Sequence, residues 1–269
     1  MSDTANSKAF SDSKVSALGY EVYSVFSKIN RAQHADTAPR LPIVFIHGAI
    51  VSHLYWMPTV RLLAETHDVY ALDLPGHGRS SKPAKALGVI EQADVISAWL
   101  AAMGMDKAVI AANSYGCEIA VELALRQPDK VDSLILTAPA SDPAEPTLRQ
   151  QGLRLLLDAF SERPTMGFVL LWDAFGPFGI GLKRCVETCQ IMVDYDYLPR
   201  LPLIRHSTLV VRGSKDTVAN EAWVERFVKL LANAELAVIE GGPHDINYCS
   251  AKELTRITNN FLENRVKNS

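Results

Sequence analysis

The sequence predicts an α/β fold in which a mostly parallel central sheet carries helices on both faces. Short apolar segments alternate with helical segments along most of the 269 residues. Several apolar segments are uninterrupted runs, as expected for strands that are buried on both faces. Residues 141–205 break this alternation, because they contain no convincing strand and are apolar and helical in character. We therefore expect one α/β body with a helical insertion.

Composition and charge restrict the class of protein. The chain is 48% hydrophobic and 21% charged, which suits one large domain with a small insertion. A net charge of −3 without a basic run argues against a nucleic-acid partner. No apolar run reaches membrane-spanning length, and the N-terminus lacks the apolar core of a signal peptide. We expect a cytoplasmic protein that acts on a small molecule and binds no membrane; the oligomeric state stays open.

The cysteines predict neither disulfides nor a metal site. Cys185 and Cys189 lie one helical turn apart, but no further cysteine or histidine cluster joins them. Free thiols in a reducing compartment are the better interpretation for these two, for Cys117 and for Cys249. The chain also has no glycine-rich phosphate loop. We expect no metal and no cofactor.

The expected elements follow in chain order. Residues 1–16 are polar and predict a loose tail, and Tyr20–Ile29 alternates as a strand or hairpin would. The body then comprises residues 17–140 and 206–269, with the insertion between them. Its further strands are expected at 43–46, 68–72, 108–111, 133–136, 208–211 and 236–239. Its helices are expected at 90–103, 117–125, 221–231 and 252–262, and residues 62–66 close a further short helix.

One strand–turn–helix junction carries the strongest chemical signal. Between the strand at 108–111 and the helix at 117–125 lies Ala112-Asn113-Ser114-Tyr115-Gly116. A strand that turns sharply into a helix brings its backbone close to itself, so small residues are needed two positions before and after the apex. This is the geometry of a nucleophile elbow, which holds a serine hydroxyl exposed in a strained turn.

This junction resembles that of the serine hydrolases of the α/β-hydrolase fold. Ala112 departs by one methyl group from the first glycine of the family's Gly-x-Ser-x-Gly pattern. Two further stretches are similar to the family: His47-Gly48 followed by Ser52 and Trp56, and the Asp-x-Pro-Gly-x-Gly-x-Ser stretch from Asp73 to Ser80. We read Ser52 and Trp56 as packing and loop support, and the 73–80 stretch as a shaped turn without chemistry.

A serine nucleophile needs a base, and the base needs an acid that fixes its tautomer. In this fold the chain order is serine, acid, histidine. His244 follows the last expected strand and is the last histidine of the chain, so it is the candidate base. Asp216 follows a strand and a glycine turn and is the candidate acid, with Asp142 as the rival. Asp245 is adjacent to the base but should point away from it.

The resemblance also implies an oxyanion hole and a cap. The two donors would be the backbone N–H groups of Tyr115 and Ala49, with Ile50 as the alternative to Ala49. His47 would hold its loop by a side-chain hydrogen bond. The insertion would cover the serine as a helical cap, so that Trp172, Phe175 and Phe178, together with Ile50, would line a substrate pocket.

These features predict a serine hydrolase with a Ser114–His244–Asp216 triad that cleaves a carboxylic ester or lactone of a small, largely apolar substrate through an acyl-enzyme. Relatives with the same triad cleave carbon–carbon bonds or act as perhydrolases, and these remain alternatives. A further alternative is a ligand-sensing protein that hydrolyses slowly and signals through its cap. The sequence does not distinguish them, because specificity depends on the shape of the cap.

Overall fold

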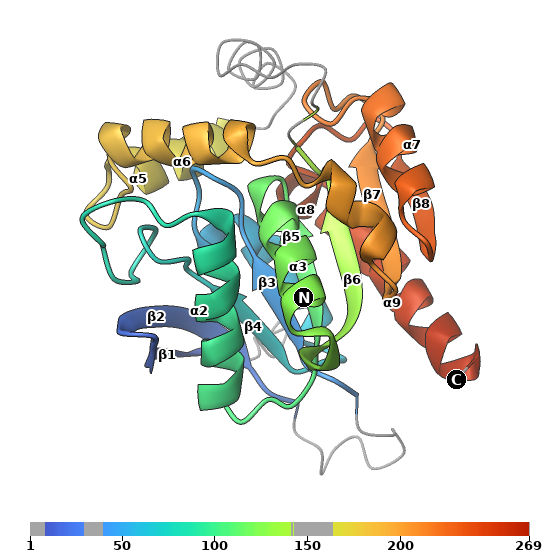
Figure 1. Ribbon diagram of the computed structural model, residues 1–269, viewed down its shortest axis with the longest axis horizontal. Coiled ribbons are helices and arrows are strands. Elements are labelled where there is room, and N and C mark those ends of the chain that lie inside the picture. The colour runs from blue at the N-terminus through green and yellow to red at the C-terminus, as the bar shows by residue number, and fades with distance from the viewer. Residues whose placement is uncertain (1–8, 30–39, 141, 143–163, 269) are drawn as a thin grey trace, which may run out of the picture.

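The computed structural model describes residues 9–29, 40–140, 142 and 164–268. Their strands form one eight-stranded sheet in the order β1-β2-β4-β3-β5-β6-β7-β8 (Figure 1). The strands are β1 (Ser11–Ala17), β2 (Tyr20–Ser27), β3 (Ile43–Ile46), β4 (Val69–Leu72), β5 (Ala108–Asn113), β6 (Val131–Thr137), β7 (Ser207–Gly213) and β8 (Ala234–Ile239). From β4 to β8 all neighbours are parallel, while β1, β2 and β4 pair antiparallel. The predicted mostly parallel sheet is confirmed.

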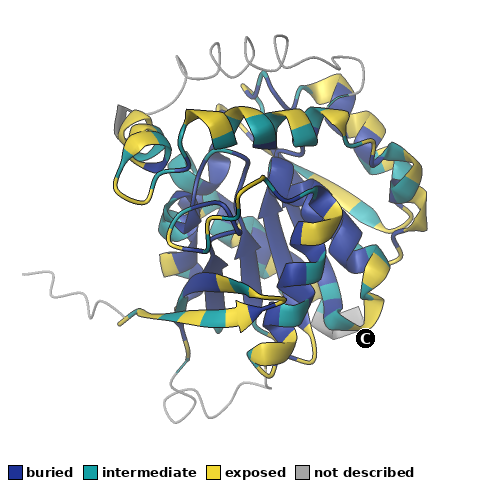
Figure 2. Cartoon of the chain, turned by 60° about the vertical axis from the view of Figure 1, so that its left-hand side comes forward, coloured by how far each residue is buried: buried dark blue, intermediate teal, exposed yellow. Residues whose placement is uncertain are grey.

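Helices cover both faces of this sheet. Side chains alternate across a strand, so Val44 and Ile46 of β3 enter one apolar cluster while Ile43 and Phe45 enter the other. The first cluster includes α2 (Val89–Ala102), α3 (Tyr115–Arg126) and α7 (Glu221–Leu230), and the second includes α1 (Met57–Leu63), α8 (Ile246–Cys249) and α9 (Ala251–Asn268). The central strands are consequently buried along their length (Figure 2).

The N-terminal segment differs from the sequence prediction. Residues 11–16 belong to β1, which pairs with β2 through a two-residue turn, so the expected loose tail is wrong for them. Both turn residues, Leu18 and Gly19, have positive φ, at 50° and 83°. That is the turn geometry whose twist matches a hairpin. The segment is polar because β1 is an edge strand whose side chains are mostly exposed or half-exposed, and a polar composition alone predicts a loop.

Other expected elements form with shifted ends. The short helix expected at 62–66 is α1 and begins at Met57, because Pro58 is tolerated in the first turn of a helix, where its missing N–H costs no hydrogen bond. The last helix runs to Asn268 instead of ending at residue 262.

The described part of the insertion is helical and lies between β6 and β7. It contains α5 (Pro164–Phe175), α6 (Leu182–Asp194) and the 3₁₀ helix η4 (Leu198–Leu203). Figure 1 shows α5 and α6 along the edge of the molecule at which β5 gives way to α3. The apolar stretch 153–160 lies outside the described residues. Division of the chain into a body and a cap at 141–205 therefore stays a prediction. Among the described helices, none has the length and apolar composition needed to cross a bilayer.

Candidate active site

Ser114 occupies the turn between β5 and α3 in a strained backbone conformation. Its φ of 53° and ψ of −124° are unusual for a residue with a side chain. The Ser114 N–H donates to the Thr137 carbonyl at 3.1 Å, which ties the turn to the end of β6. A Cβ added at Gly116 would lie 2.7 Å from the His47 carbonyl oxygen, so the turn and the end of β3 approach too closely for any larger residue. The sharp strand–turn–helix geometry expected from the sequence is present.

His244 and Asp216 are joined by a buried hydrogen bond. The two residues follow β8 and β7, and His244 Nδ1 lies 2.9 Å from Asp216 Oδ2. The other carboxylate oxygen of Asp216 accepts the backbone N–H groups of Val218 and Ala219, each at 2.8 Å. Because both carboxylate oxygens act as acceptors, Nδ1 is the donor in the pair. The neutral imidazole then has its lone pair on Nε2.

Glycines bring the loops that carry these two residues together. A Cβ added at Gly213, the last residue of β7, would lie 2.0 Å from the carbonyl oxygen of Gly242. The Lys215 N–H donates to this same oxygen at 2.9 Å. The contact fixes the distance between the Asp216 loop and the His244 loop. Sequence reasoning used Gly213 only as a turn residue and missed this contact; a glycine at the end of each of two expected strands was the available signal.

The rival carboxylates are not the partners of Nδ1. Asp245 accepts the Cys249 thiol on its Oδ2 atom at 2.7 Å, so its side chain is directed along α8. Asp142, which follows β6, was the rival acid on sequence grounds, but the carboxylate at His244 Nδ1 is that of Asp216. The assignment of the pair follows the sequence prediction.

The loop after β3 lies against Ser114. A Cβ added at Gly48 would be 3.4 Å from Ser114 Cβ, so the backbone on either side of Gly48 passes close to the serine. The backbone N–H groups of Ala49 and Tyr115 donate to no acceptor among the described residues. The Ala49 carbonyl is fixed instead, because His77 Nε2 lies 2.8 Å from it. The proposed oxyanion donors therefore flank the serine; their role stays a proposal.

Two buried histidines hold this loop in place. His47 Nε2 accepts the Leu74 N–H at 3.0 Å, so its proton is on Nδ1, which donates to the Gly48 carbonyl at 2.7 Å. Burial, with a further contribution from His77, lowers the pKa of His47 to about 3, and burial lowers that of His77 to about 4. Both rings are thus neutral near pH 7. His47 has the loop-supporting hydrogen bonds that its sequence context suggested.

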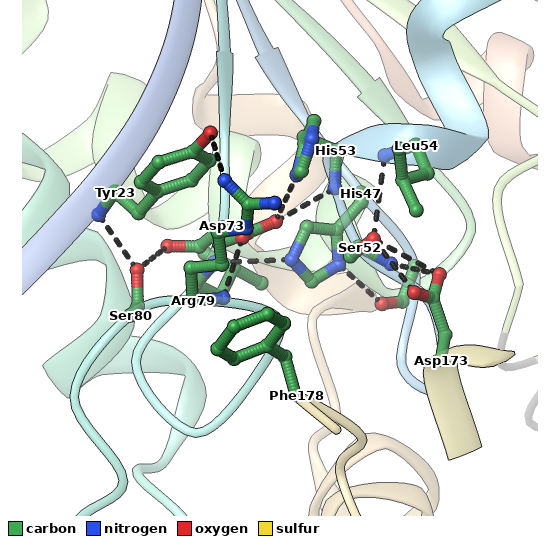
Figure 3. A network of polar contacts seen from close by, with 12 residues as sticks. Tyr23, His47, Ser52, His53, Leu54, Asp73, Arg79, Ser80, Asp173 and Phe178 are labelled. Carbon is green, nitrogen blue, oxygen red and sulfur yellow. Dashed lines mark hydrogen bonds and ion pairs between the residues drawn. The ribbon is translucent and has the colours of Figure 1, made fainter. Parts of the chain in front are cut away.

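Asp73 joins this loop to the 73–80 turn (Figure 3). The carboxylate is fully buried, yet it accepts three hydrogen bonds of 2.8 Å, from the ring and backbone N–H of His53 and from the backbone N–H of Arg79. Burial alone would raise the pKa of Asp73, but these contacts with His53 outweigh it and lower the pKa to about 2. The Asp73–Ser80 stretch, which we read as a turn, is organised around this carboxylate.

Asp173 of α5 makes the corresponding contact from the insertion. It accepts the backbone N–H and the hydroxyl of Ser52, each at 2.8 Å (Figure 3). Burial raises the pKa of this carboxyl to about 6, although the bonds from Ser52 act in the opposite direction. Ser52 supports the loop, as expected, and it does so by binding the insertion. The sequence carries no signal for this pair, which is 121 residues apart.

The sequence of this chain is similar to those of known proteins. Residues 42–168 match the model of a family described as having the alpha/beta hydrolase fold. A Caenorhabditis elegans protein, abhydrolase domain-containing protein abhd-5.2, is 30% identical over 173 residues, covering 59% of this chain and 38% of that protein. The pimeloyl-[acyl-carrier protein] methyl ester esterase of Nitrosospira multiformis is 27% identical over 231 residues, covering 75% of this chain and 87% of that enzyme.

A solved structure is similar over nearly the whole chain. Est816, described as an N-acyl homoserine lactone degrading enzyme, has a TM-score of 0.77 and 25% identity, covering 93% of this chain and 100% of that one. This chain has the α/β-hydrolase fold. It spans less than half the length of the first curated relatives that it matches, at 38% and 44%.

The four predicted pocket residues of this chain occupy different environments. Ile50 packs against the buried cluster of Val51 and Tyr55. Val169 and Leu170 of α5 pack against the same cluster, so α5 contacts the segment that follows β3. Trp172, Phe175 and Phe178 remain 43%, 69% and 50% exposed. Phe178 lies over the guanidinium of Arg79, 5.1 Å from the ring centroid. A substrate contact for these four side chains stays a prediction.

In the described part of the chain, no three His, Cys, Asp or Glu side chains are arranged to hold a metal ion. All four cysteines are free thiols, and burial raises the pKa of Cys189 to about 12.

Gly213→Ala tests the contact between the two loops. The added methyl group overlaps backbone that cannot move alone, so we expect the free energy of unfolding to fall by about 1–3 kcal/mol or more. Urea unfolding measures this change. Gly167→Ala in α5 is the matched control, because a Cβ there meets nothing within 4 Å. Equal unfolding free energies for the two variants would contradict the contact.

Asp173→Asn tests the buried carboxyl through pH dependence. The folded pKa of about 6 lies above the ordinary value of 3.8, so the folded protein holds this proton more tightly than the unfolded chain. The stability that Asp173 contributes is therefore greatest at low pH and is lost as pH rises from about 4 to 6. The unfolding free energy of wild type minus that of Asp173→Asn should fall by about 2 kcal/mol between about pH 4.5 and 6.5, then level off. An unfolding free-energy difference that is constant or rises with pH would contradict the raised pKa of Asp173. Asp129→Asn, at an exposed carboxylate, is the control.

Proposed function

We propose that this chain is a serine hydrolase that cleaves a carboxylic ester or lactone through an acyl-enzyme, with Ser114, His244 and Asp216 as its triad. The observation that carries the proposal is the buried Asp216–His244 hydrogen bond, in a protein whose Ser114 sits on a strained turn after β5 of the same sheet. The three residues come from the carboxyl ends of β5, β7 and β8, where open α/β sheets bind their ligands.

In the first step His244 Nε2 removes the proton of the Ser114 hydroxyl while the serine oxygen attacks the acyl carbon. Asp216 keeps the imidazole in the tautomer that leaves Nε2 free to accept, and it stabilises the imidazolium that forms. The second oxygen of Asp216 is occupied by two backbone N–H groups, which holds the carboxylate in place through this step.

The tetrahedral intermediate places a negative charge on the former carbonyl oxygen. In the proposal the backbone N–H groups of Ala49 and Tyr115 donate to it. Tyr115 is the first residue of α3, whose N-terminal dipole also favours negative charge. The buried His47, His77 and Asp73 contacts keep the Ala49 loop from adjusting during the reaction, so little reorganisation is needed.

The intermediate then collapses and breaks the bond to the leaving oxygen, which takes the proton from His244. Water, deprotonated by the same imidazole, attacks the acyl-enzyme, and the acid product leaves with Ser114 restored. The ester or lactone class is supported by two relatives in particular, the methyl ester esterase of Nitrosospira multiformis and the lactone-degrading Est816. The alternative of a slow, ligand-sensing hydrolase differs in turnover.

Ser114→Ala tests the nucleophile with a panel of p-nitrophenyl esters and lactones. Without the serine oxygen no acyl-enzyme forms, so we expect kcat to fall by about 10⁴-fold or more while the fold stays intact. Initial rates for both proteins measure the change, with circular dichroism as the control for folding. Full activity in Ser114→Ala would contradict the proposed mechanism. Near-single-turnover behaviour of the wild type on every substrate would favour the sensor.

Asp216→Asn tests the acid. The amide cannot hold the imidazole in the required tautomer, so kcat should fall by about 10⁴-fold with the fold retained. Asp142→Asn is the matched control, because Asp142 was the rival acid on sequence grounds. A comparable loss in Asp142→Asn together with an active Asp216→Asn would reverse the assignment. The same ester assay serves for both variants.

A further inference from the structure

A cavity lined by none of the proposed catalytic residues opens between the insertion and the β1–β2 side of the body. Its volume is about 650 Å³, and none of Ser114, Asp216 and His244 lines it. The lining includes five cationic side chains, those of Lys14, Arg79, Lys82, Lys183 and Arg184, and one carboxylate, Glu187. Neither the fold nor the proposed hydrolysis requires this concentration of positive charge.

The guanidinium of Arg79 is held by aromatic rings and has no carboxylate partner among the described residues. Its guanidinium lies 5.2 Å from the ring centroid of Tyr23 and 5.1 Å from that of Phe178, and it donates to the Tyr23 hydroxyl at 3.1 Å (Figure 3). The stacking fixes the position of the charge and leaves most of its N–H donors available. A preorganised arginine of this kind suits the recognition of an anion.

Lys82 is a second cation that forms no ion pair with a carboxylate among the described residues. Its ammonium donates to the carbonyls of Gly76 and Phe178, at 3.2 and 3.1 Å, and thereby joins the body to the α5–α6 connection. Partial desolvation lowers the pKa of Lys82, because it disfavours the charged form of the ammonium. An anion bound beside it would compensate for this loss.

The N-terminus of α6 completes the positive side of the cavity. Gly181, Leu182, Lys183 and Arg184 all line it, and this 13-residue helix has neither a side-chain cap nor an acidic residue in its first turn. Its free N–H groups and dipole therefore favour a negative charge in the cavity. One terminal nitrogen of Arg184, Nη1, is also buried without a hydrogen-bond partner in the described residues. An unpaired buried donor is costly unless a ligand accepts from it.

We propose that this cavity binds a phosphate-type anion that carries an apolar substituent. The stacked Arg79, the Lys82 ammonium and the start of α6 would hold the oxygens, and Phe178 and Leu182, which line the same cavity and are 50% and 69% exposed, would cover the substituent. The binding site lies between the body and the insertion, so its occupancy would also fix α6 against the 78–84 loop. The ligand could come from solution or from the headgroup of a lipid; both present the same chemistry.

Binding of phenyl phosphate, measured by calorimetry at low salt, tests the site without any dependence on hydrolysis. We expect a dissociation constant in the millimolar range or below, and no binding of phenol, which lacks the charge. Arg79→Gln should weaken binding at least about tenfold, as expected for the loss of a charge-assisted hydrogen bond. Added salt should weaken binding in the wild type.

Two exposed lysines provide a matched pair. Lys183 in the cavity and Lys229 in α7 are 85% and 76% exposed, and each lies one helical turn before or after a glutamate with which it pairs. Lys183→Gln should weaken phenyl phosphate binding severalfold, and Lys229→Gln should leave it unchanged. Because Lys183 supports no buried contact, this comparison stands even if Arg79→Gln is unstable.

Vesicles identify the source of the anion. Co-sedimentation with phosphatidylcholine vesicles that contain phosphatidic acid, reduced in Arg79→Gln and Lys183→Gln, would assign the site to a lipid headgroup. Phenyl phosphate binding without vesicle binding would assign it to a soluble anion. The proposal is overturned if wild type fails to bind phenyl phosphate in the millimolar range, or if all three variants bind it as the wild type does.

Discussion

Two close approaches between loops at the carboxyl ends of parallel strands depend on glycine, which allows backbone to touch backbone. At Gly116 a Cβ would lie 2.7 Å from the His47 carbonyl, and at Gly213 it would lie 2.0 Å from the Gly242 carbonyl. The first approach sets Ser114 beside the loop after β3. The second sets Asp216 within hydrogen-bond distance of His244. The strained φ of Ser114 persists because the packing around it determines the turn.

Buried polar contacts make the loop after β3 rigid from two sides. Asp73 holds it from the body, where three N–H donors keep the carboxylate ionised despite full burial. Asp173 holds it from the insertion, with a pKa of about 6 because its two bonds from Ser52 do not offset burial. The carboxyl that attaches the insertion to this loop therefore has a pKa of about 6, whereas the carboxyl that attaches the body has a pKa of about 2.

The sequence predicted the parts of the fold and of the candidate site that local patterns encode. Uninterrupted apolar runs marked β3, β5 and β7, and the small residues around Ser114 marked the turn. The sequence did not predict residues 11–16 as part of a strand, because an exposed edge strand has the composition of a loop. The Ser52–Asp173 contact and the cationic cavity were not predicted, because the residues that form them are far apart in the chain. The folded insertion brings Arg79, Lys183 and Phe178 to one place. Such contacts leave no periodicity to read.

The central claim is that Ser114 is the one nucleophile of the site. Intact-mass spectrometry and peptide mapping after reaction with a serine-directed fluorophosphonate test it directly. The account predicts one adduct per chain, on the peptide that contains Ser114, and none in the Ser114→Ala protein. Modification of another residue, or an unreactive Ser114 in a folded wild-type protein, would contradict it.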